Sequence, residues 1–200
     1  MTKTIELIFD FVSPNAYLAW KPLHDIAARH GAQIKVTPVF LGGMHNLTGN
    51  APPFIRDADI KGKNAYALLE MQRFIAKHQL TRFKMNPHFP FNSVNLMRML
   101  VSLEGDDQMK FIDTLVTAIW ENELDVSNAD ALAAVLSAAG FDAQALFVKT
   151  QDPAIKQALI DNTEKAVERG TFGIPTFYIG DEMFFGKERF GQIEDLLVKS

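Results

Sequence analysis

The residue in this chain with the clearest capacity for chemistry is Ser13, which Pro14 follows directly. Serine is a preferred helix N-cap and proline is favoured at the first helical position, so the pair is typical of a helix start. A serine hydroxyl at that position can also donate a hydrogen bond to a thiolate, and the partial positive charge of the helix end favours such an anion. Capping and catalysis do not exclude each other, and the two residues alone leave both open.

Any thiolate beside Ser13 must come from another molecule, because the 200 residues include no cysteine. Disulfide exchange, thiolate metal sites and a cysteine nucleophile are excluded for the same reason. The chain also contains no Gly-rich phosphate loop and no G-x-S-x-G motif, so neither nucleotide chemistry nor serine hydrolysis is supported. We predict no metal site, since the histidines have neither paired ligand spacing nor an acidic cluster beside them. They are His24, His30, His45, His78 and His88.

The composition is that of a folded domain without a basic surface. Hydrophobic residues make up 48% of the chain and charged residues 22%, which is too apolar for a disordered chain. The formal net charge of -4 and the scattered lysines and arginines argue against nucleic acid and anionic membrane as partners. No apolar run approaches the ~20 residues that span a bilayer, and the N-terminus resembles neither a signal nor a transit peptide. We therefore expect a cytoplasmic location.

A strand and a helix near the N-terminus must position Ser13. Residues 5–11 are apolar and predict a buried strand leading to Ser13, and residues 16–30 have apolar side chains at helical spacing. Residues 33–40 alternate polar and apolar side chains, which predicts a second strand parallel to the first. Residues 42–53 are rich in turn formers and are predicted to form a loop.

The rest of the chain predicts helices first and a short hairpin afterwards. Residues 61–169 have helical periodicity interrupted by turn residues, which predicts five or six helices. Residues 176–179 and 183–185 predict two short strands, and residues 188–199 predict a last helix.

This order favours one compact unit in which helices interrupt a small α/β domain. No repeat or low-complexity segment marks a second linked domain. We place the α/β domain in residues 1–42 and 171–200 and the helical insertion in residues 43–170. Trp20 and Trp120 fall at core spacing, and we expect both to be buried.

The element order, with Gly173-Ile174-Pro175 before the third strand, resembles the α/β plan of thioredoxin with a large all-helical insertion between the second and third strands. Ser13 then stands where redox relatives of that fold carry their reactive cysteine. Five motifs, in the same order, resemble those of 2-hydroxychromene-2-carboxylate isomerases and kappa-class glutathione transferases, which share the insertion of DsbA-like proteins. The motifs are FDFVSPNAYLAW (9–20), GNAPP (49–53), NPHFPFNSVNLMR (86–98), GTFGIPTF (170–177) and FFGKERF (184–190).

The resemblance implies that glutathione is the external thiol and that Ser13 is the catalytic residue that stabilises its thiolate. It also implies a cis bond between Ile174 and Pro175, with the Ile174 backbone pairing with the cysteinyl backbone of glutathione like an added strand. A rigid start of the third strand is the alternative for this pair. Asn50 is implied as a glutathione contact, although asparagine is also an ordinary turn residue.

The γ-glutamyl end of glutathione is held in the family by a Ser/Asn-Asp-Arg run. The corresponding residues here are Lys187, Glu188 and Arg189, so the chain departs from the pattern at the first two positions. Lys187 and Glu188 are therefore predicted cofactor contacts by position. An acidic residue in the first turn of a helix also has an ordinary explanation in dipole compensation.

Four further residues are implied beside the substrate. Lys63 and Tyr66, spaced as i and i+3 on a helix, match a Lys/Tyr pair next to the substrate pocket of the family. Asn92 and Arg98 are candidates to bind a substrate carboxylate, for which the two-pronged donors of arginine are suited. The alternatives are a solvated lysine, a half-buried tyrosine, an N-cap asparagine and a surface arginine.

The function implied is a glutathione-dependent isomerase acting on a conjugated, aromatic-derived keto acid, typically as a homodimer. A glutathione transferase or peroxidase of the same family is an alternative. A second alternative, from another class, is a non-catalytic thioredoxin-like binding module that has lost its cysteine.

Overall fold

The computed structural model describes residues 3–199 and has a mixed four-stranded sheet at its centre. The strands β1 (Thr4–Phe9), β2 (Gln33–Pro38), β3 (Thr176–Ile179) and β4 (Glu182–Phe185) lie in the order β2-β1-β3-β4. The predicted parallel pairing of β1 with β2 is confirmed, and β3 runs antiparallel to both β1 and β4. This is the thioredoxin-like fold that the element order predicted.

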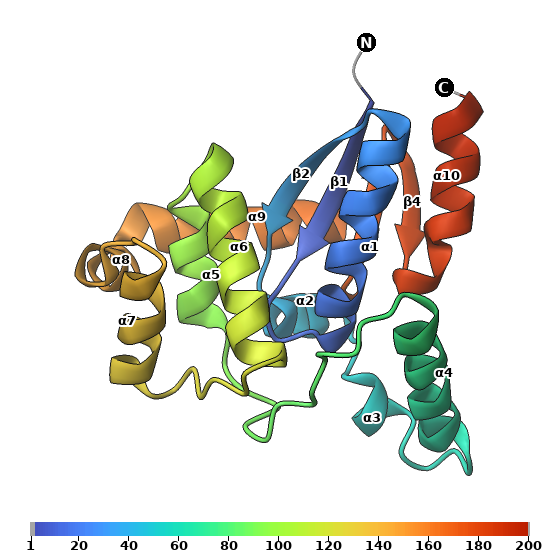
Figure 1. Ribbon diagram of the computed structural model, residues 1–200, viewed down its shortest axis with the longest axis horizontal. Coiled ribbons are helices and arrows are strands. Elements are labelled where there is room, and N and C mark those ends of the chain that lie inside the picture. Colours follow the sequence, from blue (N-terminus) through green and yellow to red (C-terminus); the bar gives the residue numbers. More distant parts are fainter. Residues whose placement is uncertain (1–2, 200) are drawn as a thin grey trace.

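Helices cover both faces of the sheet. In Figure 1, α1 (Pro14–His30) lies in front of the strands beside α10 (Phe190–Lys199), and α9 (Pro153–Glu168) crosses behind them. The helix α1 begins at its Ser13 cap and ends at Gly31, whose φ of 60° is the left-handed conformation that glycine adopts readily. A short 3-10 turn, Lys187–Arg189, precedes α10 where the sequence predicted one continuous helix.

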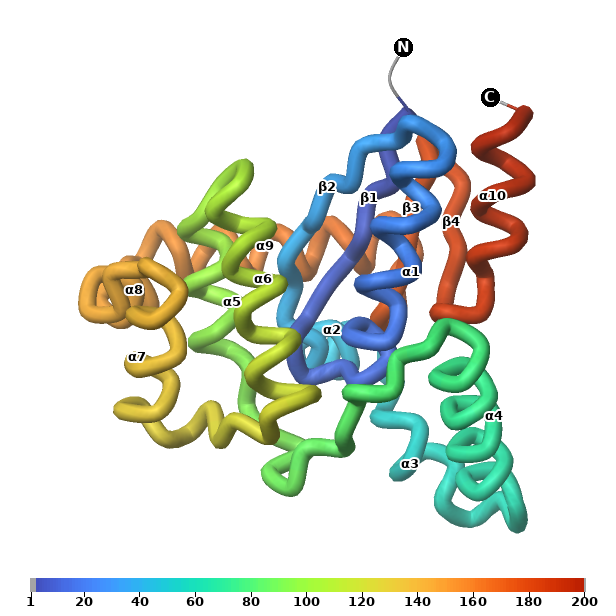
Figure 2. The backbone as a smooth tube through the Cα atoms, viewed as in Figure 1, coloured from blue at the N-terminus to red at the C-terminus, as the bar shows by residue number. Residues whose placement is uncertain are grey.

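Eight helices connect β2 to β3 within the described chain. Six of them fall between residues 61 and 169, as the periodicity predicted. The backbone trace in Figure 2 shows α5 to α8 gathered at one side of the sheet and α3 and α4 projecting below α10. The assignment of residues 43–170 to an insertion stays a prediction. The eight are α2 (Leu41–Thr48), α3 (Pro53–Arg56), α4 (Lys63–Lys77), α5 (Val94–Val101), α6 (Gly105–Trp120), α7 (Ala129–Ala138), α8 (Ala143–Lys149) and α9.

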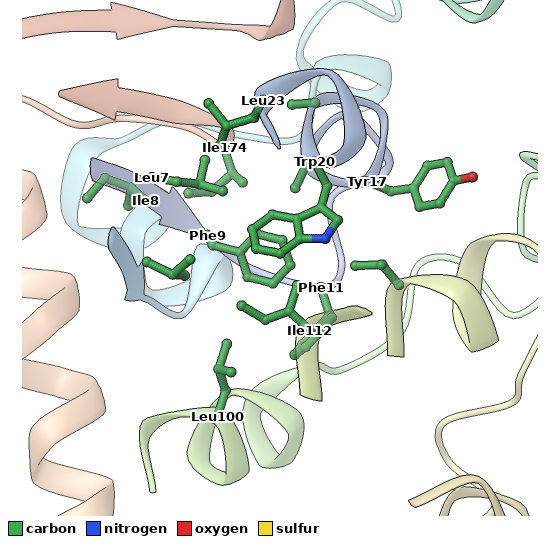
Figure 3. Packing of buried hydrophobic residues seen from close by; sticks show 14 of the residues in the cluster. Leu7, Ile8, Phe9, Phe11, Tyr17, Trp20, Leu23, Leu100, Ile112 and Ile174 are labelled. Atoms are coloured by element: carbon green, nitrogen blue, oxygen red, sulfur yellow. The ribbon is translucent and has the colours of Figure 1, made fainter. Parts of the chain in front are cut away.

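One hydrophobic core joins the sheet to the helices of the connecting segment. Phe9 and Phe11 meet edge to face, with ring centroids 5.0 Å apart, and Trp20 packs against Phe9 from α1 (Figure 3). Trp20 and Trp120 are both buried, as predicted. The indole Nε1 of Trp120 donates to the Phe11 carbonyl at 3.1 Å, so α6 holds the segment that leads to Ser13.

The predicted loop over residues 42–53 is wrong in its first half, because Leu41–Thr48 is the helix α2. Gly42 and Gly43 are poor helix formers, which is why the sequence favoured a turn. Tertiary contacts overcome this preference: the Leu41 N–H donates to the buried Asp10 carboxylate, and the Phe40 N–H donates to the Thr163 hydroxyl.

The strands β1 and β2 end earlier than predicted, and β1 and β4 each begin one residue earlier. The strand β1 stops at Phe9 rather than Phe11, because the chain turns at Asp10, whose carbonyl accepts the Ser13 N–H at 3.2 Å. The strand β2 stops at Pro38, which has no N–H for the ladder.

No helix within residues 3–199 is both long and apolar enough to cross a membrane.

Candidate active site

Ser13 is the N-cap of α1, and its capping role is confirmed. Its backbone is extended (φ −85°, ψ 113°), and its Oγ accepts the Ala16 N–H at 3.2 Å. The same hydroxyl donates to the Ile174 carbonyl at 3.3 Å, which is long for an O–H···O bond, where about 2.7–2.8 Å is usual. The residue is only 5% exposed. A hydroxyl proton held this loosely can turn toward an anion at the helix N-terminus at little cost.

The segment facing Ser13 contains the predicted cis bond between Ile174 and Pro175. The Ile174 N–H has no hydrogen-bond partner within residues 3–199, although the residue is only 7% exposed. Most backbone N–H groups in folded proteins are paired, so this N–H, on the residue whose carbonyl accepts the Ser13 hydroxyl, is available to donate to a ligand carbonyl. Gly173 permits the tight packing here, because a Cβ on it would lie 2.8 Å from the Phe185 ring.

Asn50 is brought to this segment from the end of α2. Its Nδ2 donates to the Phe172 carbonyl at 2.7 Å, two residues before Ile174. Its Oδ1 accepts the Ala51 N–H at 2.9 Å and lies 3.4 Å from Nη1 of Arg56. The structure therefore connects Asn50 to the segment that leads to Ile174 and adds Arg56, which sequence reasoning missed. The contact of Asn50 with glutathione stays a prediction.

Lys63 reaches the same region through a shared carboxylate. Asp57 accepts two hydrogen bonds from Arg56, both 2.9 Å long, and lies 3.0 Å from Nζ of Lys63. Hydrogen bonds from Arg56 and Lys63 hold the pKa of the Asp57 carboxyl well below its usual range. Both cations are about half exposed, so their remaining N–H donors face solvent, and Arg56 lies beside Asn50. Tyr66 is 60% exposed.

Lys187 and Glu188 lie on the other side of the Ile174 segment, after β4. The side chain of Lys187 is buried, its ammonium lies 5.2 Å from the centre of the Phe74 ring, and it pairs with Glu188. Gly186, directly before them, donates its N–H to the Pro175 carbonyl at 2.9 Å. The backbone of this turn is thus tied to the cis-proline, whereas the Lys187 side chain packs against α4.

Asn92 and Arg98 make their contacts elsewhere. The Asn92 Oδ1 accepts the Val94 N–H at 3.0 Å at the start of α5. Arg98 is half-buried, with Nη1 at 3.5 Å from the side-chain oxygen of Asn95 and from the carbonyl of Thr150 at the end of α8. Within residues 3–199, their hydrogen-bond partners belong to α5 and to the end of α8 rather than to the Ser13 group.

Two hollows lie beside α1, and Ser13 lines neither of them. One, of about 370 Å³, lies between α1 and α6 and is lined by Tyr17, Trp20 and Glu121 among others. The other, of about 460 Å³, lies between α1, α4 and the 3-10 turn and is lined by Lys187 and Glu188 among others.

Asp10 is a buried carboxylate three residues before Ser13 that sequence reasoning missed. It is fully buried; its Oδ1 accepts the Val12 N–H at 3.0 Å and its Oδ2 accepts the Leu41 N–H at 2.8 Å. Ser93 Oγ makes no hydrogen bond of normal geometry, yet it lies near enough to favour the charged carboxylate. Burial outweighs these groups and raises the pKa of Asp10 to about 6. An acidic residue near the end of the predicted strand over residues 5–11 was the available signal.

Titration of Asp10 should make the protein more stable at mildly acid pH. Its pKa is raised from 3.8 to about 6 on folding, so the folded state binds the proton more tightly. The resulting stabilisation is present at low pH and is lost as pH rises through about 6. Between pH 7 and pH 5 this group alone adds about 1.4 kcal/mol to the free energy of unfolding.

Urea unfolding at the two pH values measures this contribution. The difference in unfolding free energy between pH 5 and pH 7 should be smaller in Asp10→Asn than in the natural protein by about 1.4 kcal/mol. An unchanged difference in the variant would show that Asp10 does not titrate in this range.

Comparison with known proteins shows the family to which the chain belongs. Residues 4–198 match the family model of the DSBA-like thioredoxin domain. The 2-hydroxychromene-2-carboxylate isomerase of Sphingobium xenophagum is 30% identical over 199 residues, which cover 99% of this chain and 100% of that protein. Glutathione S-transferase kappa 1 of Rattus norvegicus is 27% identical over 209 residues, covering 98% of this chain and 91% of that protein.

A solved structure shows the same similarity in three dimensions. A 2-hydroxychromene-2-carboxylate isomerase superposes with a TM-score of 0.83 and 26% sequence identity, covering 98% of this chain and 95% of the other. The similarity thus extends over the sheet and the helices between β2 and β3 alike. The chain belongs to the family of DSBA-like thioredoxin domains, among relatives that are named isomerases and kappa-class glutathione transferases.

Proposed function

We propose that the protein is a glutathione-dependent isomerase of the 2-hydroxychromene-2-carboxylate type. The observation that carries the proposal is that the Ser13 hydroxyl, at the N-terminus of α1, donates to the Ile174 carbonyl beside a cis-proline, while the Ile174 N–H has no partner within residues 3–199. The relatives that are named isomerases and kappa-class glutathione transferases support glutathione as the ligand. Asn50, tied to the Phe172 carbonyl, borders the same site.

The residues of the site fit glutathione as a peptide with a thiol at its centre. The Ile174 N–H can donate to the cysteinyl carbonyl, as in an added strand, which would set the sulfur toward Ser13. The γ-glutamyl end would extend toward Lys187 and Glu188. When bound, glutathione supplies a thiolate that adds reversibly to a conjugated carbon, so that a double bond becomes a single bond about which the substrate can rotate.

Ser13 makes that thiolate available at neutral pH. A free thiol with a pKa of about 8.5 is only about 3% ionised at pH 7, and lowering the pKa by about two units makes the thiolate the main species. The Ser13 hydroxyl can donate to the sulfur in place of the Ile174 carbonyl, and the positive end of α1 favours the same charge. Both effects act at one atom.

The substrate carboxylate would be received by cations near Asn50. Lys63 and Arg56 both pair with Asp57, and each keeps further N–H donors directed to solvent. Tyr66, Asn92 and Arg98 stay predictions as further substrate contacts.

A direct assay tests the isomerase. Purified protein, glutathione and 2-hydroxychromene-2-carboxylate should give a change in ultraviolet absorbance that is absent without glutathione. S-methylglutathione, which has no free thiol, should not replace glutathione. Absence of any glutathione-dependent change in absorbance would contradict the proposed isomerase activity.

A kappa-like glutathione transferase or peroxidase is the alternative within the family, supported by the kappa-class relatives. A stable glutathione conjugate among the products would favour it. A non-catalytic thioredoxin-like module would be favoured instead if calorimetry detected no binding of glutathione at millimolar concentration. The homodimer and the cytoplasmic location stay predictions, and light scattering tests the first.

A further inference from the structure

Asp10 is the one fully buried carboxylate in the described chain, and its contacts connect it to the proposed site in two directions. On one side its carbonyl accepts the Ser13 N–H and its Oδ1 accepts the Val12 N–H, so that it shapes the turn carrying Ser13. On the other side its Oδ2 accepts the N–H of Leu41, the first residue of α2.

The helix α2 depends on Asp10 for its start. Its own N-cap residue, Phe40, makes no side-chain capping bond, and its first turn contains no acidic residue. The Asp10 carboxylate, 31 residues earlier in the chain than Leu41, supplies the missing acceptor at 2.8 Å. An anion at this position also interacts favourably with the helix dipole.

The far end of α2 leads back to Ser13. Asn50 follows Gly49 at the end of the helix and donates to the Phe172 carbonyl. Two residues later, the Ile174 carbonyl accepts the Ser13 hydroxyl. Asp10 therefore connects the two ends of a closed path that runs through Ser13, Ile174, Asn50 and α2.

We propose that Asp10, in its ionised form, is the positioning residue that holds Ser13 and Asn50 in the geometry that binds glutathione. This inference rests on the proposed glutathione site. An ionised carboxylate accepts at both oxygens, whereas a protonated one places a donor against either the Val12 or the Leu41 N–H. Protonation therefore breaks one of the two connections and releases either the Ser13 turn or the start of α2.

The groups facing the Asp10 carboxylate are neutral. The Leu41 and Val12 N–H groups and the Ser93 hydroxyl lower its pKa, and no ionised side chain contributes among the described residues. Desolvation raises the pKa to about 6, so the change of form falls within the range in which enzymes are assayed. If only the ionised form binds, about one molecule in ten is competent at pH 5, and the apparent affinity falls about tenfold relative to pH 7.

The test measures the binding of S-methylglutathione by calorimetry at pH 5 and pH 7. This probe has no thiol, so neither thiol ionisation nor repulsion between a thiolate and Asp10 contributes. Its carboxyl and amino groups keep their charges over the same range. The natural protein should bind about tenfold more weakly at pH 5 than at pH 7. Asp10→Asn should bind more weakly than the natural protein at pH 7 and should change less than twofold between the two pH values.

The double variant His45→Gln/His78→Gln is the matched control. His45 lies on α2, and His78 lines the hollow that contains Lys187 and Glu188, so either could mimic the effect by titrating. The double variant should keep the tenfold pH effect. The inference is overturned if the natural protein changes less than twofold, if the double histidine variant loses the effect, or if Asp10→Asn keeps either the pH effect or natural affinity at pH 7.

Two further results are distinguishable from these. If neither glutathione nor S-methylglutathione binds the natural protein at pH 7, the proposed function fails rather than the role of Asp10. If Asp10→Asn does not fold, as judged by circular dichroism, the profiles of the natural protein and of the histidine variant decide the question by themselves.

Discussion

Replacing Ser13 with alanine is expected to lower glutathione-dependent turnover about a hundredfold while the protein stays folded. The variant removes the one hydroxyl at the N-terminus of α1 that can donate to a thiolate, and a hydrogen bond to a charged group contributes about 1.5–3 kcal/mol. A loss at the upper end of that range corresponds to about two orders of magnitude in rate. The ultraviolet thiolate absorbance of bound glutathione should disappear together with the activity.

Ser13→Ala should also destabilise the protein, because Ser13 Oγ caps α1. Loss of an N-cap costs about 1 kcal/mol, which lowers Tm by about 2–4 °C in a chain of this size. Asn128→Ala is the matched control, since Asn128 caps α7 by accepting the Ala131 N–H at 3.0 Å. The control should lose similar stability and keep full turnover. Equal turnover in Ser13→Ala and Asn128→Ala would reduce Ser13 to a cap.

Replacing Trp120 with alanine is expected to give the largest loss of stability. The indole is fully buried, and the rings of Phe83, Phe89 and Phe91 lie about it with centroids 6.0–6.1 Å from its own. Truncating a buried tryptophan costs about 3–5 kcal/mol, and the Phe11 carbonyl also loses its donor. Urea unfolding should show this loss, and Tm should fall by about 10 °C or more.

Two controls separate packing from hydrogen bonding at Trp120. Trp120→Phe keeps most of the ring volume and loses the Nε1 donor, so it should cost clearly less than Trp120→Ala. Leu68→Ala truncates an apolar side chain that is 56% exposed and should change the free energy of unfolding by no more than about 0.5 kcal/mol. A Trp120→Ala effect as small as that of Leu68→Ala would contradict the central place given to this residue in the core.

The elements that the sequence predicted well are those specified by short-range patterns. The strand Thr176–Ile179 was predicted to the residue, because four apolar and β-branched residues lie between a proline and a glycine-containing turn. The start of α1 at Ser13-Pro14 followed from capping preferences that involve only neighbouring residues. The helix α2 was missed because its two glycines favour a turn and its compensating acceptors, Asp10 and Thr163, are remote in sequence.

The predicted site residues also differ in whether a short-range sequence pattern could indicate them. Asn50 was named only because a family resemblance implied it, since no local pattern links it to Phe172, whose carbonyl accepts its Nδ2. Its contact with glutathione stays a prediction. Arg98 is suited to a carboxylate by chemistry alone, and only the packing of α5 against α8 shows that its Nη1 lies 3.5 Å from the Thr150 carbonyl. Its contact with substrate stays a prediction. Arg56 and Asp57 were not predicted, because an ion pair on a short helix has no distinctive sequence signal.

By itself the sequence determined that no cysteine can act, that Ser13 begins a helix, and that a proline precedes the third strand. Each of these follows from residue identity or from neighbours within a few positions. Only the tertiary structure decided what Ser13 faces: Ile174 lies 161 residues away, Phe172 lies 122 residues from Asn50, and Leu41 lies 31 residues from Asp10. Such pairs form because the core brings β1, α2 and β3 together, and local preferences contain no record of that packing.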